Sequence, residues 1–79
     1  MRVDKFLKVS RIIKRRTVAG DACAAGRIVA NGKAGKPSYQ VTPGAVLEIA
    51  FGDRILKVEV LTVAEHASKD EAASLYREL

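Results

Sequence analysis

The chain has 79 residues, of which 48 % are hydrophobic and 29 % are charged, and its formal net charge at pH 7 is +5. This length allows one small domain and leaves no room for a separate catalytic domain. The composition is that of a folded chain, and because only 5 % of the residues are aromatic, Ala, Val, Ile and Leu must build most of the core.

The first element is a short helix over residues 3 to 10, where apolar side chains recur at spacings of three and four. Lys5 and Lys8 then share the opposite side of this helix. Asp4 falls in the first turn, where the helix dipole favours an acid, and we interpret it as a terminal stabiliser rather than as a functional residue.

A connection over residues 11 to 16 follows, and we expect its two isoleucines to be held in the core. Thr17 is the candidate N-cap of a second helix that runs to about Ala25. Gly26 supplies the expected stop.

The spacing of apolar residues changes to a period of two at residues 27 to 30, which predicts a short strand. Asn31-Gly32 is the strongest two-residue turn signal, and we interpret Asn31 as a turn residue rather than a reader of bases. Residues 33 to 38 read as a loop, and Pro43-Gly44 predicts a second turn. Residues 45 to 61 alternate clearly enough to predict a hairpin.

The chain becomes helical again near its end. Ser68 and Glu71 have the spacing of a capping box, and an apolar stripe continues to Leu79. We therefore divide the chain into a domain over residues 1–64 and a helical tail over residues 65–79. Helices first and a sheet after place the fold in the α+β class.

Few residues offer chemistry of their own. Cys23 has no partner for an internal disulfide, and with His66 as the one histidine there is no ligand set for zinc, so we expect no metal and no cofactor. We interpret Cys23 as a small core residue and assign no role to His66. No apolar run approaches the roughly 20 residues that cross a bilayer, and the N-terminus does not have the pattern of a signal peptide. We expect a cytoplasmic protein.

Positive charge is concentrated in the first half. Through residue 36, ten Lys and Arg oppose two acids, a balance of +8, whereas four bases and seven acids in residues 37 to 79 give −3. A nucleic acid is the leading partner for such a chain. The candidate RNA-binding residues are Arg2, Lys5, Lys8, Arg11, Lys14, Arg15, Arg16, Arg27, Lys33 and Lys36.

These candidates do not carry equal weight. Arginine is favoured over lysine, because its planar guanidinium matches phosphate oxygens and stacks on bases, while a lone lysine is more often a solvated side chain. Arg15 and Arg16 are adjacent bases before a helix, where an anion relieves their repulsion, so RNA contact is preferred for this pair. For Arg27, Lys33 and Lys36, RNA contact and simple solvation are evenly balanced.

Five segments in order resemble the S4 RNA-binding domain over roughly residues 1 to 50. The matching segments are Arg2-Val3-Asp4-Lys5-Phe6-Leu7, Arg15-Arg16-Thr17, Gly26-Arg27-Ile28-Val29-Ala30-Asn31-Gly32, Lys36-Pro37-Ser38, and Val41 with Pro43-Gly44. Ala45 departs from the pattern, since many members have Asp there. The resemblance implies two short N-terminal helices packed on a small bent antiparallel sheet, with RNA bound by the basic face of the helices and the loop before Asn31.

The whole chain is similar to the stand-alone S4 proteins of bacterial ribosome-associated quality control. This resemblance implies a protein that is not an enzyme and that binds obstructed large ribosomal subunits. Its expected partners are ribosomal RNA of the large subunit, the P-site peptidyl-tRNA, and a protein that drives alanine tailing of the stalled chain. We expect a monomer that does not bind membranes.

Three alternatives stay open. The first is an S4-type ribosome assembly or heat-shock factor that binds ribosomal RNA. The second is a detached RNA-targeting module of an RNA-modifying enzyme, since the chain shows no catalytic constellation of its own. The third is a protein-interaction module that acts through the acidic half and the tail.

The number of phosphate contacts can be read from salt dependence. If six of the basic residues neutralise phosphates, the slope of log affinity against log salt concentration should be about −4 to −5. Filter binding of RNA over a salt series measures this slope. A slope near zero would contradict the assignment of these residues to an RNA surface.

Overall fold

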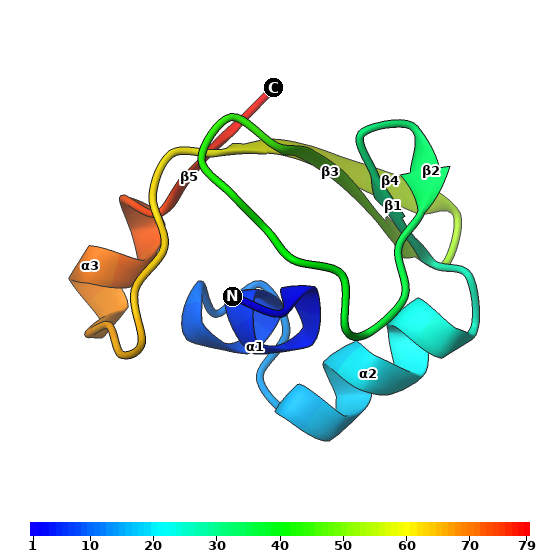
Figure 1. Ribbon diagram of the computed structural model, residues 1–79, viewed down its shortest axis with the longest axis horizontal. Coiled ribbons are helices and arrows are strands. Elements are labelled where there is room, and N and C mark those ends of the chain that lie inside the picture. Colours follow the sequence, from blue (N-terminus) through cyan, green and yellow to red (C-terminus); the bar gives the residue numbers. More distant parts are fainter.

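Two short helices lie against one face of an antiparallel sheet (Figure 1). The computed structural model describes residues 1–79. Its elements are α1 (Val3–Val9), α2 (Arg16–Ala24), β1 (Ile28–Ala30), β2 (Lys33–Ala34), β3 (Val46–Phe51), β4 (Arg54–Val60), α3 (Lys69–Ala73) and β5 (Tyr76–Glu78). The five strands have the order β2-β1-β3-β4-β5, and every neighbouring pair is antiparallel. The predicted α+β class is confirmed.

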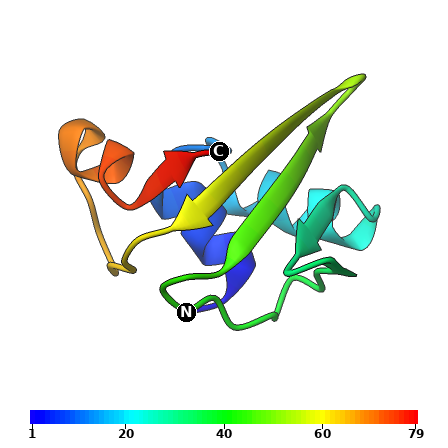
Figure 2. The same ribbon diagram turned by 90° about the horizontal axis from the view of Figure 1, so that it is seen from above.

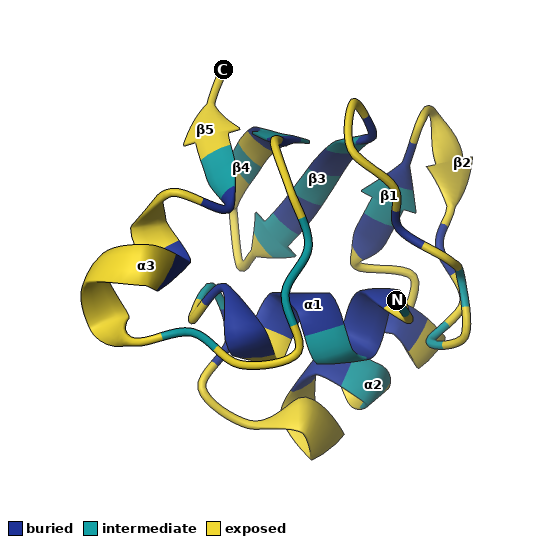
Figure 3. Cartoon of the chain, turned by 60° about the vertical axis from the view of Figure 1, so that its left-hand side comes forward, coloured by how far each residue is buried: buried dark blue, intermediate teal, exposed yellow.

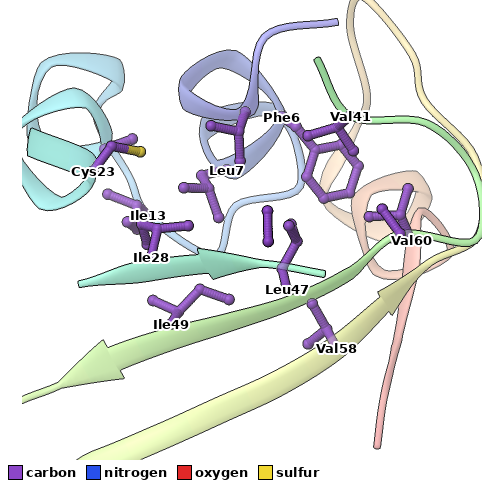
Figure 4. Close-up of a cluster of buried hydrophobic side chains, with 14 of the residues drawn as sticks. Phe6, Leu7, Ile13, Cys23, Ile28, Val41, Leu47, Ile49, Val58 and Val60 are labelled. Atoms are coloured by element: carbon purple, nitrogen blue, oxygen red, sulfur yellow. The ribbon is translucent and has the colours of Figure 1, made fainter. Parts of the chain in front are cut away.

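The core is centred on α1 and the inner face of the sheet. Val3, Phe6 and Leu7 have no exposed surface, and Figure 4 shows Phe6 and Leu7 among the buried side chains of the sheet strands. Full burial of such a side chain contributes roughly 1.5–3 kcal/mol. The apolar spacing that predicts α1 is therefore also what attaches this helix to the sheet.

The connection between the two helices is held by Ile13, which is buried with Cys23 of α2 and Ile28 of β1 (Figure 4). The prediction that Thr17 is the N-cap of α2 is wrong. Arg15 occupies that position with extended dihedrals (φ −121°, ψ 137°), and its carbonyl accepts the N–H of Ala19 at 3.0 Å, so the helix begins before Thr17.

The Asn31-Gly32 turn is confirmed. Both residues have positive φ, 51° and 81°, as a two-residue turn between antiparallel strands requires. This turn returns the chain against β1, so Lys33 and Ala34 pair with Ala30 and Val29 as β2. The prediction of a loop from residue 33 is wrong for these two residues.

The predicted hairpin over residues 45 to 61 is also confirmed, as β3 and β4. Leu47, Ile49 and Val58 are fully buried on the face toward the helices, while the residues between them point to the other face. Figure 2 shows the tip of this hairpin extending past the body of the molecule. The β3–β4 hairpin thus has a buried inner face and a projecting end.

The C-terminal segment is only partly helical. The capping box is confirmed: Glu71 N–H donates to Ser68 Oγ at 3.2 Å, and Ser68 N–H donates to Glu71 Oε1 at 3.0 Å, which holds the pKa of Glu71 below its usual value. The prediction of a helix continuing to Leu79 is wrong, because α3 ends at Ala73 and β5 then pairs with β4. The edge of β4 offers unpaired backbone groups that this pairing satisfies.

Asn31 tests how the β1–β2 turn is stabilised. Its Oδ1 accepts the N–H of Val46 at 2.9 Å, so the side chain also ties the turn to β3. We expect Asn31→Ala to lower the free energy of unfolding by about 1–2 kcal/mol, because alanine is strained at positive φ and the hydrogen bond is lost.

The control is Asn31→Gly, which loses the hydrogen bond but is at ease at positive φ. It should destabilise the protein less than Asn31→Ala in urea unfolding followed by circular dichroism. Equal losses of unfolding free energy for the two variants would show that the backbone conformation at position 31 does not contribute to stability.

Candidate nucleic-acid interface

Backbone hydrogen bonds on both sides of Arg2 hold its main chain in place. The N–H of Val41 donates to the carbonyl of Met1, and the N–H of Val3 donates to the carbonyl of Tyr39, each at 2.7 Å. Arg2 therefore sits in an antiparallel bridge, held by hydrogen bonds on both sides. Its side chain starts from a defined point at the beginning of α1.

The carboxylate of Asp4 forms ion pairs with two arginines, Arg2 and Arg16. Arg2 donates from Nε to Oδ1 at 3.2 Å and from Nη2 to Oδ2 at 3.3 Å, while Arg16 Nη2 lies 3.6 Å from Oδ1. The Asp4 side chain is 9 % exposed, whereas those of Arg2 and Arg16 are 47 % and 48 % exposed. We call Arg2, Asp4 and Arg16 the Asp4 cluster. Each guanidinium keeps part of its surface open to an anion.

The sequence identified both arginines but not what joins them. Asp4 lies in the first turn of α1, as predicted, and its Oδ1 also accepts the N–H of Lys5 at 2.8 Å. Its burial and its ion pair with Arg16 depend on the packing of two helices, which is a tertiary contact. The one available signal was that Asp4 is the only acid among seven bases in the first 16 residues.

A second basic group lies at the other end of α1. Lys8, Arg11 and Lys14 line a groove of about 390 Å³ together with Val9, Glu65, His66 and Ala67, and we call it the basic groove. Arg11 has φ 63°, a conformation that glycine usually occupies after a helix, and it is exposed. Asp4 and Lys8 are four residues apart on α1, so the groove begins about 6 Å along the helix from Asp4.

Lys5 already forms an ion pair within the protein, with Glu65. Its ammonium group donates to Glu65 Oε2, and this hydrogen bond together with the positive charge of Lys5 holds the pKa of Glu65 below its usual value. Glu65 therefore brings a negative charge to the basic groove and competes with any anion for Lys5. Of the lysines predicted on α1, Lys8 is the more available one.

The other candidates are distributed unevenly. Arg15 is exposed beside Arg16 and forms no ion pair, and Figure 3 shows the start of α2 exposed beside a largely buried α1. The N–H of Asp4 donates to the carbonyl of Pro37 at 3.4 Å, which brings the loop that carries Lys36 beside the Asp4 cluster. The structure does not bring Arg27 or Lys33 into either basic group.

No set of three or more His, Cys, Asp or Glu side chains is placed to hold a metal ion. Cys23 is buried, and burial raises the pKa of its thiol, which disfavours the reactive thiolate. None of the helices has the length and apolar character needed to span a bilayer.

Comparison with known proteins gives a consistent picture. A family model described as S4 domain matches residues 1–47. Over 96 % of its length the chain is 50 % identical to the "RQC P-site tRNA stabilizing factor" of Halalkalibacterium halodurans, and the match covers 86 % of that protein. The protein of the same name in Bacillus subtilis is 47 % identical over 96 % of the chain, and the match covers 88 % of that protein. The fold matches the trimeric heat shock protein 15 of Vibrio cholerae with a TM-score of 0.93 at 30 % identity, covering 100 % of this chain and 81 % of that one.

The pairing of Lys5 with Glu65 leads to a test in which binding improves. Glu65→Gln removes a negative charge from the basic groove and releases Lys5. We expect RNA to bind about two to five times more tightly at low salt, with the gain shrinking at physiological salt, because exposed charges are screened. Fluorescence anisotropy with labelled transfer RNA measures the change.

The matched control is Glu48→Gln on β3. Its neighbours Leu47 and Ile49 are buried toward the helices, so Glu48 points to the opposite face of the sheet. This variant changes the net charge by the same amount and should leave affinity nearly unchanged. The same gain from both variants would mean that net charge alone, and not the groove, decides binding.

Proposed function

The chain belongs to the S4 domain family, and on that premise we propose that it is a non-enzymatic RNA-binding factor of ribosome-associated quality control. It binds large ribosomal subunits that still carry peptidyl-tRNA and contacts both ribosomal RNA and the P-site tRNA. A partner protein then extends the stalled chain with alanine. The protein acts in the cytoplasm as a monomer and needs no cofactor.

The Asp4 cluster carries this proposal. Two arginines that share one buried carboxylate are held close together, with about half of each side chain exposed. A guanidinium presents several N–H donors in a plane, which suits the oxygens of a phosphate group. Because Asp4 already orders both side chains, binding a phosphate costs less conformational entropy than it would with free arginines.

The basic groove extends the proposed contact to a second stretch of RNA. Lys8, Arg11 and Lys14 add three positive charges at the far end of α1, and Arg15 and Lys36 lie beside the Asp4 cluster. Such surfaces read the backbone and shape of RNA rather than base edges. A small rigid domain with two basic groups is suited to hold one RNA in place against another, as a stabilising factor must.

A second candidate function rests on the similarity to heat shock protein 15. In this alternative the chain binds ribosomal RNA as an assembly or heat-shock factor, and peptidyl-tRNA plays no part. Both candidates use the same basic surface. They differ in whether occupied subunits are preferred over empty ones.

Co-sedimentation with large ribosomal subunits separates the two candidates. At physiological salt we expect the protein to prefer subunits that retain peptidyl-tRNA over empty subunits. Arg16→Ala should weaken this binding by about 1.5–3 kcal/mol, the range for losing a hydrogen bond to a charged group, and the Arg15→Ala, Arg16→Ala double variant should abolish the preference.

The charge-matched control is the double variant Lys57→Ala, Arg77→Ala. Both residues lie on β4 and β5, on the sheet face that points away from the helices, so this variant should bind as the unmodified protein does. Equal binding to empty and loaded subunits would favour the second candidate. Absence of binding to either would contradict both.

A further inference from the structure

A small apolar hollow opens between α2, the connection that precedes it and the end of β3 at the β3–β4 hairpin. It has a volume of about 270 Å³, and seven of its nine lining residues are hydrophobic. We call it the apolar hollow; the residues that matter for its chemistry are Ile12, Val18, Ala22 and Phe51 with the two cations Lys14 and Arg27.

Two of the apolar side chains that line the hollow are open to water. Val18 is 49 % exposed and Phe51 is 44 % exposed. Phe51 continues the series of Leu47 and Ile49, so its ring is on the sheet face that points toward α2. An aromatic face is therefore presented at the rim of the hollow, beside the helix that carries Val18.

The charges around the hollow specify an anionic occupant. Lys14 and Arg27 line it, no acidic residue does, and neither cation forms an ion pair within the protein. Arg54 stands directly opposite Phe51 across the hairpin, and Asp53 in the turn between them offsets its charge, so Lys14 and Arg27 are the cations that decide the charge of the hollow. The occupant should thus combine an apolar body with a negative charge at its edge.

The size of the hollow favours one flat ring over a folded segment of protein. A docking helix places anchors at positions i, i+4 and i+7, which span about 10 Å, and needs an elongated groove. This hollow lies just below the volume range of about 300–1,000 Å³ in which drug-sized ligands bind. One nucleobase, with its phosphate outside, matches these dimensions and charges.

We infer that the apolar hollow binds a single unpaired nucleotide of the RNA, with its base stacked on Phe51 and its phosphate held by Lys14 and Arg27. Lys14 also lines the basic groove, so the RNA backbone passes from one site to the other without a gap. Unpaired bases stack readily on aromatic side chains and on guanidinium planes. This inference rests on the proposed RNA-binding function and adds to it a base-binding site that shares only Lys14 with the two basic groups.

Substitution of Phe51 separates stacking from simple apolar contact. Phe51→Leu keeps an apolar side chain but removes the ring, and we expect affinity for peptidyl-tRNA-loaded large subunits to fall about tenfold, in the range of a lost base stack. Phe51→Trp should bind at least as tightly as the unmodified protein. If Phe51→Leu binds normally, the hollow accepts an apolar group without stacking and the inference is wrong. Because Phe51 is partly exposed, both variants should keep the thermal stability of the fold.

Photo-crosslinking identifies the occupant itself. A benzophenone amino acid placed at position 51 should give a nuclease-sensitive RNA adduct on loaded large subunits. The control places the same group at Ile55, which is 68 % exposed on the other face of the same hairpin. A protein adduct at position 51, or equal RNA adducts at positions 51 and 55, would overturn the nucleotide assignment.

The failure of this inference is distinguishable from failure of the proposed function. Co-sedimentation of each labelled protein is measured before irradiation. Protein that sediments with loaded subunits but forms no RNA adduct at position 51 contradicts the nucleotide site alone. Unlabelled protein that does not sediment with any subunit contradicts the proposed function, and the nucleotide site with it.

Discussion

The buried carboxylate of Asp4 joins the start of α1 to the start of α2 through Arg2 and Arg16. A carboxylate this far from water is tolerated only when charged and hydrogen-bonded partners surround it, and these two arginines with the Lys5 N–H supply them. The same contacts that close the pair of helices therefore determine where two guanidinium groups lie on the surface. Structure and proposed binding depend on one interaction, since anything that loosens Asp4 also disperses the arginines that would meet a phosphate.

Positive charge is distributed unevenly over the domain. Ten of the fourteen basic residues lie in the first 36 residues, whereas on the sheet face that points away from the helices Glu48 and Glu59 are matched by Lys57 and Arg77. An RNA would attract the basic side of the molecule and leave the outer face of the sheet free. The apolar hollow lies at the border of the basic side, at the projecting end of the β3–β4 hairpin, where an RNA held on the helices could still reach it.

Local signals were enough to predict much of the fold. The Asn31-Gly32 turn and the Ser68 capping box depend on residues a few positions apart, and the structure contains both. The strand β5 was missed because its reason lies in the unpaired edge of β4, far away in the sequence. The clustering of charge in the sequence likewise predicted the candidate RNA-binding residues. The ion pairs of Arg16 with Asp4 and of Lys5 with Glu65, however, arise only from packing. These pairs decide which bases are oriented and which are occupied, and sequence periodicity does not carry that information.

A double-mutant cycle on RNA affinity tests most directly whether Asp4 organises the interface. Removing a negative charge from a surface that binds RNA should by itself strengthen binding. If Asp4 orients the arginines, Asp4→Asn instead weakens binding, and its effect is not additive with that of Arg16→Ala, with a coupling of about 0.5–3 kcal/mol as found for residues in one ion-pair network. Binding that is tighter in Asp4→Asn, and effects that simply add, would show that the arginines act independently of Asp4 and would contradict the central role given to it.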